Sequence, residues 1–313
     1  MMNSKPQEGL LSVRNLSKIF YSGIINREKT VGAKNVSFDL EPGKIISLIG
    51  ESGSGKTTVG KLILKLLQPT EGEIYFRGQD ITNLTSKKEK KRYYSKVQGV
   101  FQDPFSSFNS LFRVDRIFNM IFRIFMPEVG KSEQEDRILE AIREVNLTPD
   151  LLEKYPHQLS GGQLQRLLIA RALLLDVDVL IADELISMLD ASTRMGVLNL
   201  LLDICQEKGM AILFITHDLN LGYYLSDTTL IMYEGRLVER GGTRKIYENP
   251  VHPYTKMLFE SVPGVEERWD RDEDFVPEEI DKIVREFYDN HEGQGFSEVE
   301  EAHHVLFSEQ KID

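Results

Sequence analysis

Short apolar runs and segments of helical periodicity alternate along this chain. The apolar runs predict buried strands at residues 44–49, 97–102, 177–184 and 210–218. Apolar residues recur at helical spacing after two of these regions, which predicts helices at residues 59–67 and 164–174. This alternation is typical of an α/β fold, in which ligands bind at the carboxyl ends of the strands.

Two further regions have a different pattern. Residues 11–16 and 33–40 predict a pair of strands, and residues 73–79 predict part of a hairpin. Residues 103–158 are helical by pattern, with an apolar face over residues 111–126 that several charges interrupt. That face is too charged to span a membrane and apolar enough to pack against another protein.

The first buried run is followed by a phosphate-binding loop. Residues 50–58 fit the pattern G-x-x-x-x-G-K-[ST] and stand between a predicted strand and a predicted helix, which is the context that the pattern requires. The glycines let successive N–H groups face a ligand, and the helix start adds a positive dipole end. Lys56 is expected to reach the β- and γ-phosphates, and Thr57 to ligate Mg²⁺. A nucleoside triphosphate is therefore the predicted ligand, with contacts from Gly50, Ser52, Gly53, Ser54, Gly55, Lys56, Thr57 and Thr58.

Polar residues follow the other buried runs. Gln102 ends one run, Asp183 and Glu184 end the next, and His217 ends the last. Because the carboxyl ends of parallel strands meet at one edge of a sheet, these residues should lie near the phosphate loop. One carboxylate can hold the Mg²⁺ shell while the next orients or deprotonates the attacking water. The sequence therefore predicts hydrolysis as well as binding.

Two other segments are candidates for nucleotide contact. Ser160 is suited to cap the helix that begins at residues 160–163, and Gly161 and Gly162 permit close approach of a ligand to the backbone. Phe20 or Tyr21 can stack on a purine ring, or can simply pack a strand end; the spacing from the preceding strand slightly favours Phe20.

Composition limits the alternatives. No apolar run approaches the roughly eighteen residues of a membrane span, and residues 1–8 lack the apolar stretch of a secretory signal. The single cysteine, Cys205, excludes an internal disulfide and a four-cysteine metal site, and its apolar neighbours predict a buried thiol. The net charge of the chain is −11. Residues 265–313 alone have a net charge of −12, from seventeen acidic and five basic residues, so the rest of the chain is nearly neutral. The acidity argues against nucleic acid as the main partner.

The ordered motifs resemble those of the ATP-binding subunit of ABC transporters over about residues 10–264. The matching motifs are the Walker A loop Gly50–Thr58, the Q-loop Gln102, the signature Leu159–Gln163, the Walker B pair Asp183–Glu184, the D-loop Ser187–Asp190 and the switch histidine His217. The resemblance implies a P-loop NTPase (RecA-like) α/β core with an antiparallel β subdomain and an inserted helical subdomain at about residues 103–158. Residues 265–313 would form an acidic C-terminal extension.

Finer likeness indicates the oligopeptide/dipeptide importer group. Residues 102–109, 235–241 and 249–255 resemble that group's segments, and residues 56–62 resemble the second of its two paired ATPases. The resemblance implies an ATPase that couples hydrolysis to peptide uptake. The alternatives are the same motor role in oligosaccharide uptake and, in a different class, a soluble ABC ATPase acting on ribosomes or DNA.

The resemblance also implies a mechanism and partners. Two similar ATP-binding subunits, as a heterodimer, would meet head to tail, so that Ser160–Gln163 of one closes over the γ-phosphate held by Lys56 of the other; Asp190 would join the nucleotide contacts. Glu184 would activate water and His217 would stabilise the developing charge, while Thr57, Gln102 and Asp183 hold Mg²⁺. Two membrane-spanning permease subunits and an extracellular substrate-binding protein would complete the importer, with this chain peripheral at the cytoplasmic face of the cell membrane.

The chain also departs from the family pattern. Leu185 and Met188 replace a usual proline and alanine, and neither position supplies a catalytic side chain. Many members bind an iron–sulfur cluster through cysteines after the His-Pro-Tyr-Thr segment; this chain has none there, so no cluster is expected. Residues 276–287 predict one amphipathic helix, and His303 and His304 are expected to be solvated. The charge of the tail predicts a separable appendage, because self-repulsion disfavours compact packing.

Overall fold

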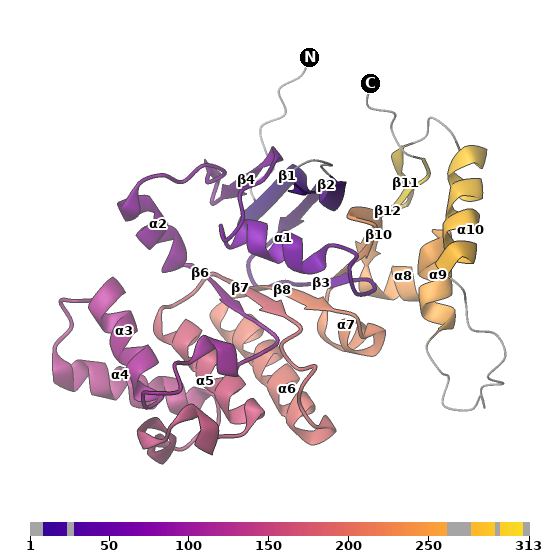
Figure 1. Cartoon of the computed structure of the whole chain (residues 1–313). Helices are drawn as coiled ribbons and strands as arrows, with labels where there is room; N and C mark the ends of the chain where they lie inside the picture. The colour runs from indigo at the N-terminus through magenta and orange to yellow at the C-terminus, as the bar shows by residue number, and fades with distance from the viewer. Residues whose placement is uncertain (1–8, 24–27, 262–276, 292–294, 309–313) are drawn as a thin grey trace.

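The computed structural model describes residues 9–23, 28–261, 277–291 and 295–308 of the 313-residue chain. Two sheets organise it, a four-stranded antiparallel sheet in the order β2-β1-β4-β5 and an eight-stranded sheet in the order β11-β12-β10-β9-β3-β8-β7-β6. Helix α1 lies between the two sheets, and helices α3 to α6 gather on the other side of the large sheet (Figure 1). The predicted α/β core with an antiparallel β subdomain and a helical insert is confirmed.

The large sheet is built around the four predicted buried strands, which are confirmed. Its parallel strands are β6 (Val97–Val100), β7 (Val179–Asp183), β8 (Ala211–Thr216), β3 (Ile45–Ile49) and β9 (Thr228–Tyr233). Every residue of β3, β7 and β8 is buried, as expected for parallel strands covered on both faces. Strand β10 (Arg236–Gly242) then runs antiparallel to β9.

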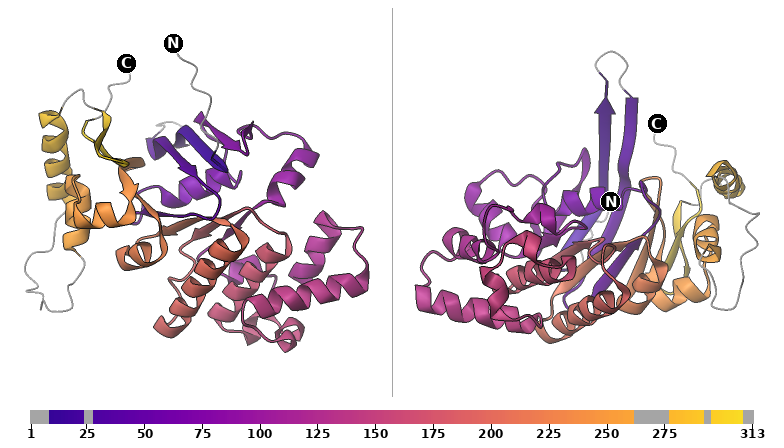
Figure 2. Two further views of the ribbon diagram at one scale, coloured as in Figure 1. Left: turned by 180° about the vertical axis from the view of Figure 1, so that it is seen from behind. Right: turned by 60° about the horizontal axis from the view of Figure 1, so that its bottom comes forward.

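The small sheet covers α1 (Lys56–Ile63). Its strands are β1 (Leu11–Ser22), β2 (Glu28–Leu40), β4 (Glu71–Phe76) and β5 (Gln79–Asp80). Strands β1 and β2 form a long antiparallel pair that stands out from the body of the molecule (Figure 2). Their inner residues pack with α1 in one core cluster, which includes Val13, Phe38 and Leu62.

Helix α1 differs from its predicted bounds. It begins three residues earlier than expected, because Gly55 turns the chain directly into the helix with φ 104°. It also ends earlier, and Lys65 just beyond it has a left-handed φ of 55°. The phosphate loop therefore leads directly into the first turn of the helix.

The helical elements surround these sheets. In chain order they are α2 (Lys87–Tyr94), the 3₁₀ turn Phe105–Ser107, α3 (Asp115–Phe125), α4 (Lys131–Glu144), the 3₁₀ turns Pro149–Glu153 and Pro156–Gln158, α5 (Gly161–Leu174), α6 (Ala191–Lys208), α7 (Leu219–Leu225), α8 (Thr243–Glu248), α9 (Pro253–Glu260) and α10 (Pro277–Asn290). Helix α6 holds Cys205, whose thiol is buried, and this burial raises its pKa to about 11. Within the described ranges, no helix is both long and apolar enough to cross a membrane.

The C-terminal residues differ most from expectation. Helix α10 forms as predicted, but β11 (Phe296–Glu300) and β12 (His303–Leu306) extend the large sheet through pairing of β12 with β10. The described residues of the tail therefore pack on the domain, although the charge of the tail disfavours compact packing, and the separability of the tail stays a prediction. Without the hairpin, strand β10 would leave backbone groups unpaired at the edge of the sheet. The hairpin covers this edge while the acidic side chains of Glu298, Glu300 and Glu301 remain exposed.

The expectation that His303 is solvated is wrong. His303 is fully buried, and its Nε2 lies 2.7 Å from Oε1 of Glu239, which is also fully buried. The same carboxylate accepts the backbone N–H groups of Val251 at 2.9 Å and His252 at 3.1 Å. A buried carboxylate needs such partners, and one of them comes from the tail. His304 is only partly buried, and burial lowers its pKa, with the charge of Arg240 acting in the same direction.

Replacing His303 with alanine is expected to lower the free energy of unfolding by about 3 kcal/mol, because breaking a buried pair leaves a buried charge with fewer partners. Denaturant titration of the full chain measures this loss. His304→Ala is the matched control, since it removes the neighbouring, less buried imidazole. Equal effects of the two changes would show that the Glu239–His303 contact is not what fastens the hairpin.

Candidate active site

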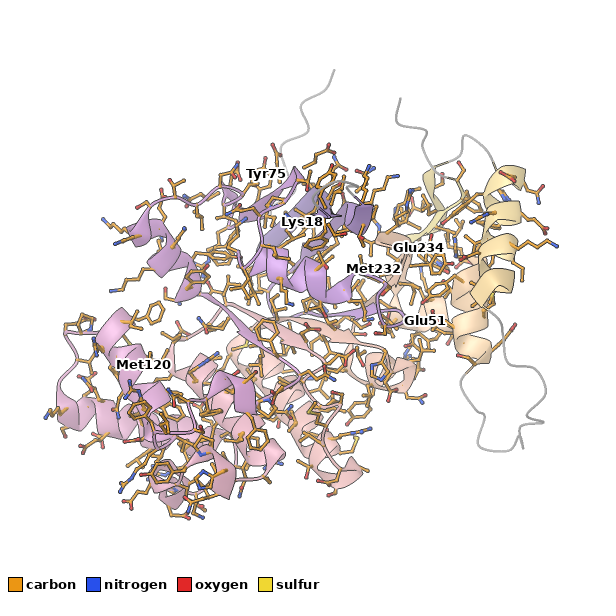
Figure 3. The ribbon with its side chains drawn as sticks, in the orientation of Figure 1. Lys18, Glu51, Tyr75, Met120, Met232 and Glu234 are labelled. Carbon is orange, nitrogen blue, oxygen red and sulfur yellow. The ribbon has the colours of Figure 1, made fainter. Side chains whose placement is uncertain are left out.

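The phosphate loop is held in place by close backbone contacts. A Cβ atom on Gly50 would lie 2.1 Å from the Met232 carbonyl oxygen, and one on Gly55 would lie 2.2 Å from that of Gly32. These contacts require glycine at both positions. The backbone N–H of Glu51 donates to the Tyr254 hydroxyl at 3.0 Å. Figure 3 labels Glu51 and Met232 on the side of the molecule next to α9.

Lys56 lies inside this loop. Its Nζ donates to the carbonyl oxygens of Gly50 and Glu51, both at 2.7 Å, and the side chain is buried. Burial lowers the pKa of Lys56, and the nearby carboxylates of Glu184 and Asp183 oppose that shift. Loop carbonyls are weak partners for an ammonium group compared with phosphate oxygens. The loop and Lys56 therefore fit a bound triphosphate.

Thr57 and Asp183 face each other at the start of α1 and the end of β7. The Thr57 hydroxyl donates to Oδ1 of Asp183 at 3.2 Å. Burial raises the pKa of the Asp183 carboxyl, and the hydrogen bond from Thr57 opposes the rise. A cation would stabilise this buried carboxylate, and Mg²⁺ is bound through one or two carboxylates together with phosphate oxygens. The pair therefore fits a Mg²⁺ that arrives with a nucleotide.

Gln102 lies two residues beyond β6, the neighbour of β7, and its side chain is exposed. Among the described residues, Thr57 and Asp183 bond each other, and Gln102 makes no hydrogen bond to either. Across the described residues, no cluster of three or more His, Cys, Asp or Glu side chains forms a ready-made metal site. Metal binding here would depend on the nucleotide for its remaining ligands.

Glu184 and His217 meet at the ends of β7 and β8. His217 Nδ1 lies 3.2 Å from Oε1 of Glu184. Glu184 has a left-handed φ of 49°, which is unusual for this residue type, and its N–H donates to the Ile215 carbonyl at 2.9 Å. Such strain is typical of functional positions. In this backbone conformation the Glu184 carboxylate contacts His217.

The signature residues form a capped helix start. Ser160 Oγ accepts the N–H of Gln163 at 3.2 Å, and the Gln163 side chain accepts the N–H of Ser160 at 2.9 Å. This reciprocal capping box holds the first turn of α5. A Cβ atom on Gly162 would lie 2.4 Å from Thr193 of α6, whereas one on Gly161 would lie 3.8 Å from Leu189.

Asp190 caps α6 beside the signature. Its carboxylate accepts the Thr193 N–H at 3.0 Å and the hydroxyls of Ser192 at 2.6 Å and Thr193 at 2.7 Å. The hydrogen bonds from these two hydroxyls lower the pKa of the Asp190 carboxyl. The signature and the D-loop of one chain are therefore neighbours through Thr193.

The signature is separated from the phosphate loop by the large sheet. Leu180 and Ala182 of β7 pack in the core cluster that contains α5, whereas Ile181 packs in the cluster that contains α1. Because successive strand residues point to opposite faces, α1 and α5 lie on opposite faces of the sheet, as Figure 1 shows. In the described part of the chain, no hydrogen bond joins residues 160–163 to Lys56.

Of the two aromatic candidates, Phe20 lies closer to the phosphate loop. A Cβ atom on Gly32 would lie 2.4 Å from the Phe20 ring and 3.1 Å from Thr58 Cγ2, so the ring lies against β2 near the start of α1. Tyr21 is 62% exposed, and as the next residue of the strand it points to the opposite face. The geometry favours Phe20 for contact with a base.

Sequence reasoning missed two contributors to the loop. Tyr254 of the His-Pro-Tyr-Thr segment accepts a loop N–H, and Met232 of β9 closes on Gly50 and Gly55. Tyr254 could have been found, because it stands in a recognisable motif and has a hydroxyl group that can bond the loop. Neither contact can be inferred from spacing, since both join segments about two hundred residues apart.

Known proteins are similar to this chain in sequence and in fold. A family model described as ABC transporter matches residues 33–187, and one described as oligopeptide/dipeptide transporter, C-terminal region, matches residues 238–291. The chain is 37% identical over 302 residues to the oligopeptide transport ATP-binding protein OppF of Bacillus subtilis (strain 168), covering 96% of this chain and 97% of that protein. It is 41% identical over 260 residues to the dipeptide transport ATP-binding protein DppF of Escherichia coli (strain K12), covering 82% and 77%. Among solved structures, a dimeric ATP-binding cassette in a post-hydrolysis state bound to ADP and Pi matches with a TM-score of 0.68 and 28% identity, over 75% of this chain and 99% of that one.

Proposed function

Since the chain belongs to the ATP-binding subunits of ABC transporters, in the group with the oligopeptide/dipeptide C-terminal region, we propose that it is the ATP-hydrolysing motor of a peptide importer. The observation that carries the proposal is the arrangement at the carboxyl ends of β3, β8 and β7. There the phosphate loop lies beside the Thr57–Asp183 pair and the Glu184–His217 pair. Residues 10–264 would form the ATP-binding domain and residues 265–313 an extension whose hairpin docks on its sheet.

The phosphate side of the proposed reaction rests on Lys56 and the loop. Lys56 exchanges its loop carbonyls for the β- and γ-phosphate oxygens, and the N–H groups of residues 50–58 bind the remaining oxygens. Mg²⁺, held by Thr57, Asp183 and Gln102, would neutralise charge on the phosphates as they separate. Phe20 would stack on the base.

Glu184 and His217 would act on the attacking water and on the charge that develops during hydrolysis. Glu184 orients the attacking water and accepts its proton, which is a general-base role. His217 holds the Glu184 carboxylate at 3.2 Å and stabilises charge that develops on the γ-phosphate. The strained backbone of Glu184 fixes the carboxylate before the nucleotide arrives.

The signature residues would act on a partner's nucleotide. They lie across the sheet from their own phosphate loop, and the N–H groups at the start of α5 suit an anion. A head-to-tail pair with a second, similar ATP-binding subunit brings Ser160–Gln163 and Asp190 to the γ-phosphate of that subunit. This arrangement gives two composite sites in each pair.

The helical subdomain would contact the membrane-spanning subunits. Leu111 is 78% exposed, and Met120 and Ile124 on the outer face of α3 are also exposed (Figure 3 labels Met120). Met120 lines an open groove of about 640 Å³ together with Phe112 and Arg116, whose guanidinium stacks 3.5 Å from the Phe112 ring centroid. An exposed apolar face with a groove suits a helix from another protein.

The complete importer would contain two permease subunits and an extracellular substrate-binding protein, with this chain peripheral on the cytoplasmic face of the membrane. ATP and Mg²⁺ are the proposed cofactors, and no iron–sulfur cluster is proposed, because the chain has no cysteine after Cys205. The relatives' names favour peptides over oligosaccharides and give no support to ribosomes or DNA as targets.

Reconstitution of the complete complex tests this function. With the permeases, the partner ATPase and the binding protein in liposomes, we expect ATP-dependent transport of a labelled dipeptide or pentapeptide and none of a labelled trisaccharide. A complex carrying Glu184→Gln is the control for dependence on hydrolysis. Transport of the sugar in place of the peptides would favour the oligosaccharide alternative, and ATP hydrolysis without transport of either would contradict an importer role.

A further inference from the structure

The peptide unit between Gly50 and Glu51 is hydrogen-bonded on both of its sides. Its N–H, on Glu51, donates to the Tyr254 hydroxyl at 3.0 Å, and its C=O, on Gly50, accepts Lys56 Nζ at 2.7 Å. This peptide is trans, and the N–H and C=O of a planar trans peptide point in opposite directions. The Tyr254 hydroxyl therefore fixes the orientation of the carbonyl that holds Lys56.

The phosphate loop gains from such an anchor because it is rich in glycine. Three of the six residues from Gly50 to Gly55 are glycine, and Gly53 and Gly55 have φ values of 87° and 104°. Glycine has access to many backbone conformations, so a free loop would lose much conformational entropy on closing around phosphate. A loop that is already held in one conformation avoids part of that loss and binds its ligand more tightly.

Helix α10 of the C-terminal extension holds the ring of Tyr254. The Tyr254 ring packs on Tyr233 of β9, with 4.3 Å between the ring centroids, and the Tyr233 hydroxyl donates to Oδ1 of Asp281 on α10. Val284 of α10 is buried in the same apolar cluster as Tyr254 and Ile49, the last residue of β3 before the loop. Helix α10 lies beside α9, the helix that contains Tyr254 (Figures 1 and 2). The contacts thus run from α10 to the phosphate loop.

Helix α10 also supports the backbone of Tyr254, through His252. His252 is fully buried, and its Nδ1 accepts the backbone N–H of Tyr254 at 3.2 Å. Burial lowers the pKa of His252 to about 3, so the ring is neutral and can accept this bond. Phe287 and Tyr288 of α10 contact the His252 ring, with centroid distances of 5.3 Å and 5.7 Å. Both the ring and the backbone of Tyr254 are therefore positioned by contacts that lead to α10.

We propose that Tyr254 is a positioning residue for the phosphate loop and that helix α10 acts on the nucleotide site through it. The C-terminal extension then raises the affinity of the chain for its nucleotide, in addition to covering an edge of the large sheet. The proposal rests on ATP binding by this ABC transporter family member and does not depend on which substrate is transported.

Tyr254→Phe in the full chain tests the first part. The change removes the hydroxyl and keeps the ring that packs on Tyr233. Calorimetric titration with ATP and Mg²⁺ should show a Kd that is about three- to tenfold larger, the effect of losing one neutral hydrogen bond. The KM for ATP should rise by the same factor with kcat within about twofold, because the loop binds the nucleotide before and during the reaction. A merely structural role would lower the number of binding sites per chain and leave the Kd of the folded chains unchanged.

Tyr247→Phe is the matched control for this change. Tyr247 packs against the same apolar cluster, and its hydroxyl donates to a backbone carbonyl, that of Leu219 at 2.6 Å, away from the phosphate loop. Its loss should leave the Kd for ATP unchanged.

Asp281→Ala tests the part of the proposal that concerns α10. It removes the acceptor of the Tyr233 hydroxyl and should raise the Kd for ATP about threefold. Asp289→Ala, which removes an exposed carboxylate from the same helix, is its control and should have no effect. Asp281→Ala combined with Tyr254→Phe should bind ATP no more weakly than Tyr254→Phe alone, because both changes act on one contact.

A wild-type or smaller Kd in Tyr254→Phe would overturn the positioning role, and so would an equal increase in Tyr247→Phe. No effect of Asp281→Ala, or factors that multiply in the double variant, would refute the action of α10 through Tyr254. Asp281 is only partly buried, so Asp281→Ala keeps the test valid should Tyr254→Phe fail to fold. These binding readouts need neither transport nor hydrolysis, so failure of the importer role would leave them interpretable.

Discussion

Glu184→Gln is expected to retain ATP binding and to lose nearly all hydrolysis, a fall of at least ~10²–10⁴-fold. Glutamine keeps the shape of the side chain and can still contact His217, but it cannot accept a proton from water. The backbone contacts of residue 184 with Ile215 and Ser187 do not involve the carboxylate, so the fold should be unaffected. Phosphate release and nucleotide affinity, measured side by side, separate the two effects.

The matched control is Glu207→Gln, which removes an exposed carboxylate on α6 and should hydrolyse ATP at the wild-type rate. Wild-type turnover in Glu184→Gln would remove Glu184 from the base role. Loss of nucleotide binding in that variant would indicate that the Glu184–His217 contact supports the site structurally.

Complementation between two inactive variants is expected to restore hydrolysis if each active site takes parts from two chains. Lys56→Ala removes the phosphate ligand, and Gly161→Asp places a negative charge at the signature; each change alone should lower hydrolysis by about 10²-fold or more. In a mixed dimer, one site combines both defects and the other has both parts intact. Mixing at high protein concentration should therefore recover a measurable fraction of activity.

Gly161 is the better position for this test than Gly162. A Cβ atom at Gly162 would collide with Thr193 in the same chain, whereas one at Gly161 meets only Leu189 at an ordinary contact distance. Gly130→Asp is the control, since it places the same side chain before α4, where nothing lies within 4 Å of the new Cβ atom.

The same test applies to a pair with the proposed second ATP-binding subunit. There Gly161→Asp should impair the partner's nucleotide site and leave this chain's own nucleotide contacts unchanged. A photoreactive ATP analogue bound at Lys56 that labels Ser160 of the same chain would refute the head-to-tail arrangement.

Much of the fold is encoded in local patterns that can be read directly. The buried strands that end at Ile49, Asp183 and Thr216 are continuous apolar runs, and each is followed by residues whose chemistry suits phosphate or water. The Ser160–Gln163 capping box is local as well, since its two hydrogen bonds join residues three apart. Such features need no knowledge of distant segments.

The features that were missed depend on contacts between distant segments. Nothing near His303 in the sequence indicates that Glu239 lies buried and in need of a hydrogen-bond donor. The net charge of the tail indicated repulsion, but on the described parts of α10 and the hairpin the charges other than Asp281 lie on exposed positions, while Val305 and His303 are fully buried. Net charge does not distinguish residues on the exposed face of a helix or strand from residues on its buried face.

The docked hairpin also has a consequence for solubility. Without β12, strand β10 would present an open edge ready to pair with a strand of another molecule. With the hairpin in place, the outermost strand of the sheet is the five-residue β11, whose Glu298 and Glu300 are exposed. A short edge strand that carries like charges resists pairing with a second copy of itself. The hairpin of β11 and β12 thus protects the large sheet against edge-to-edge aggregation.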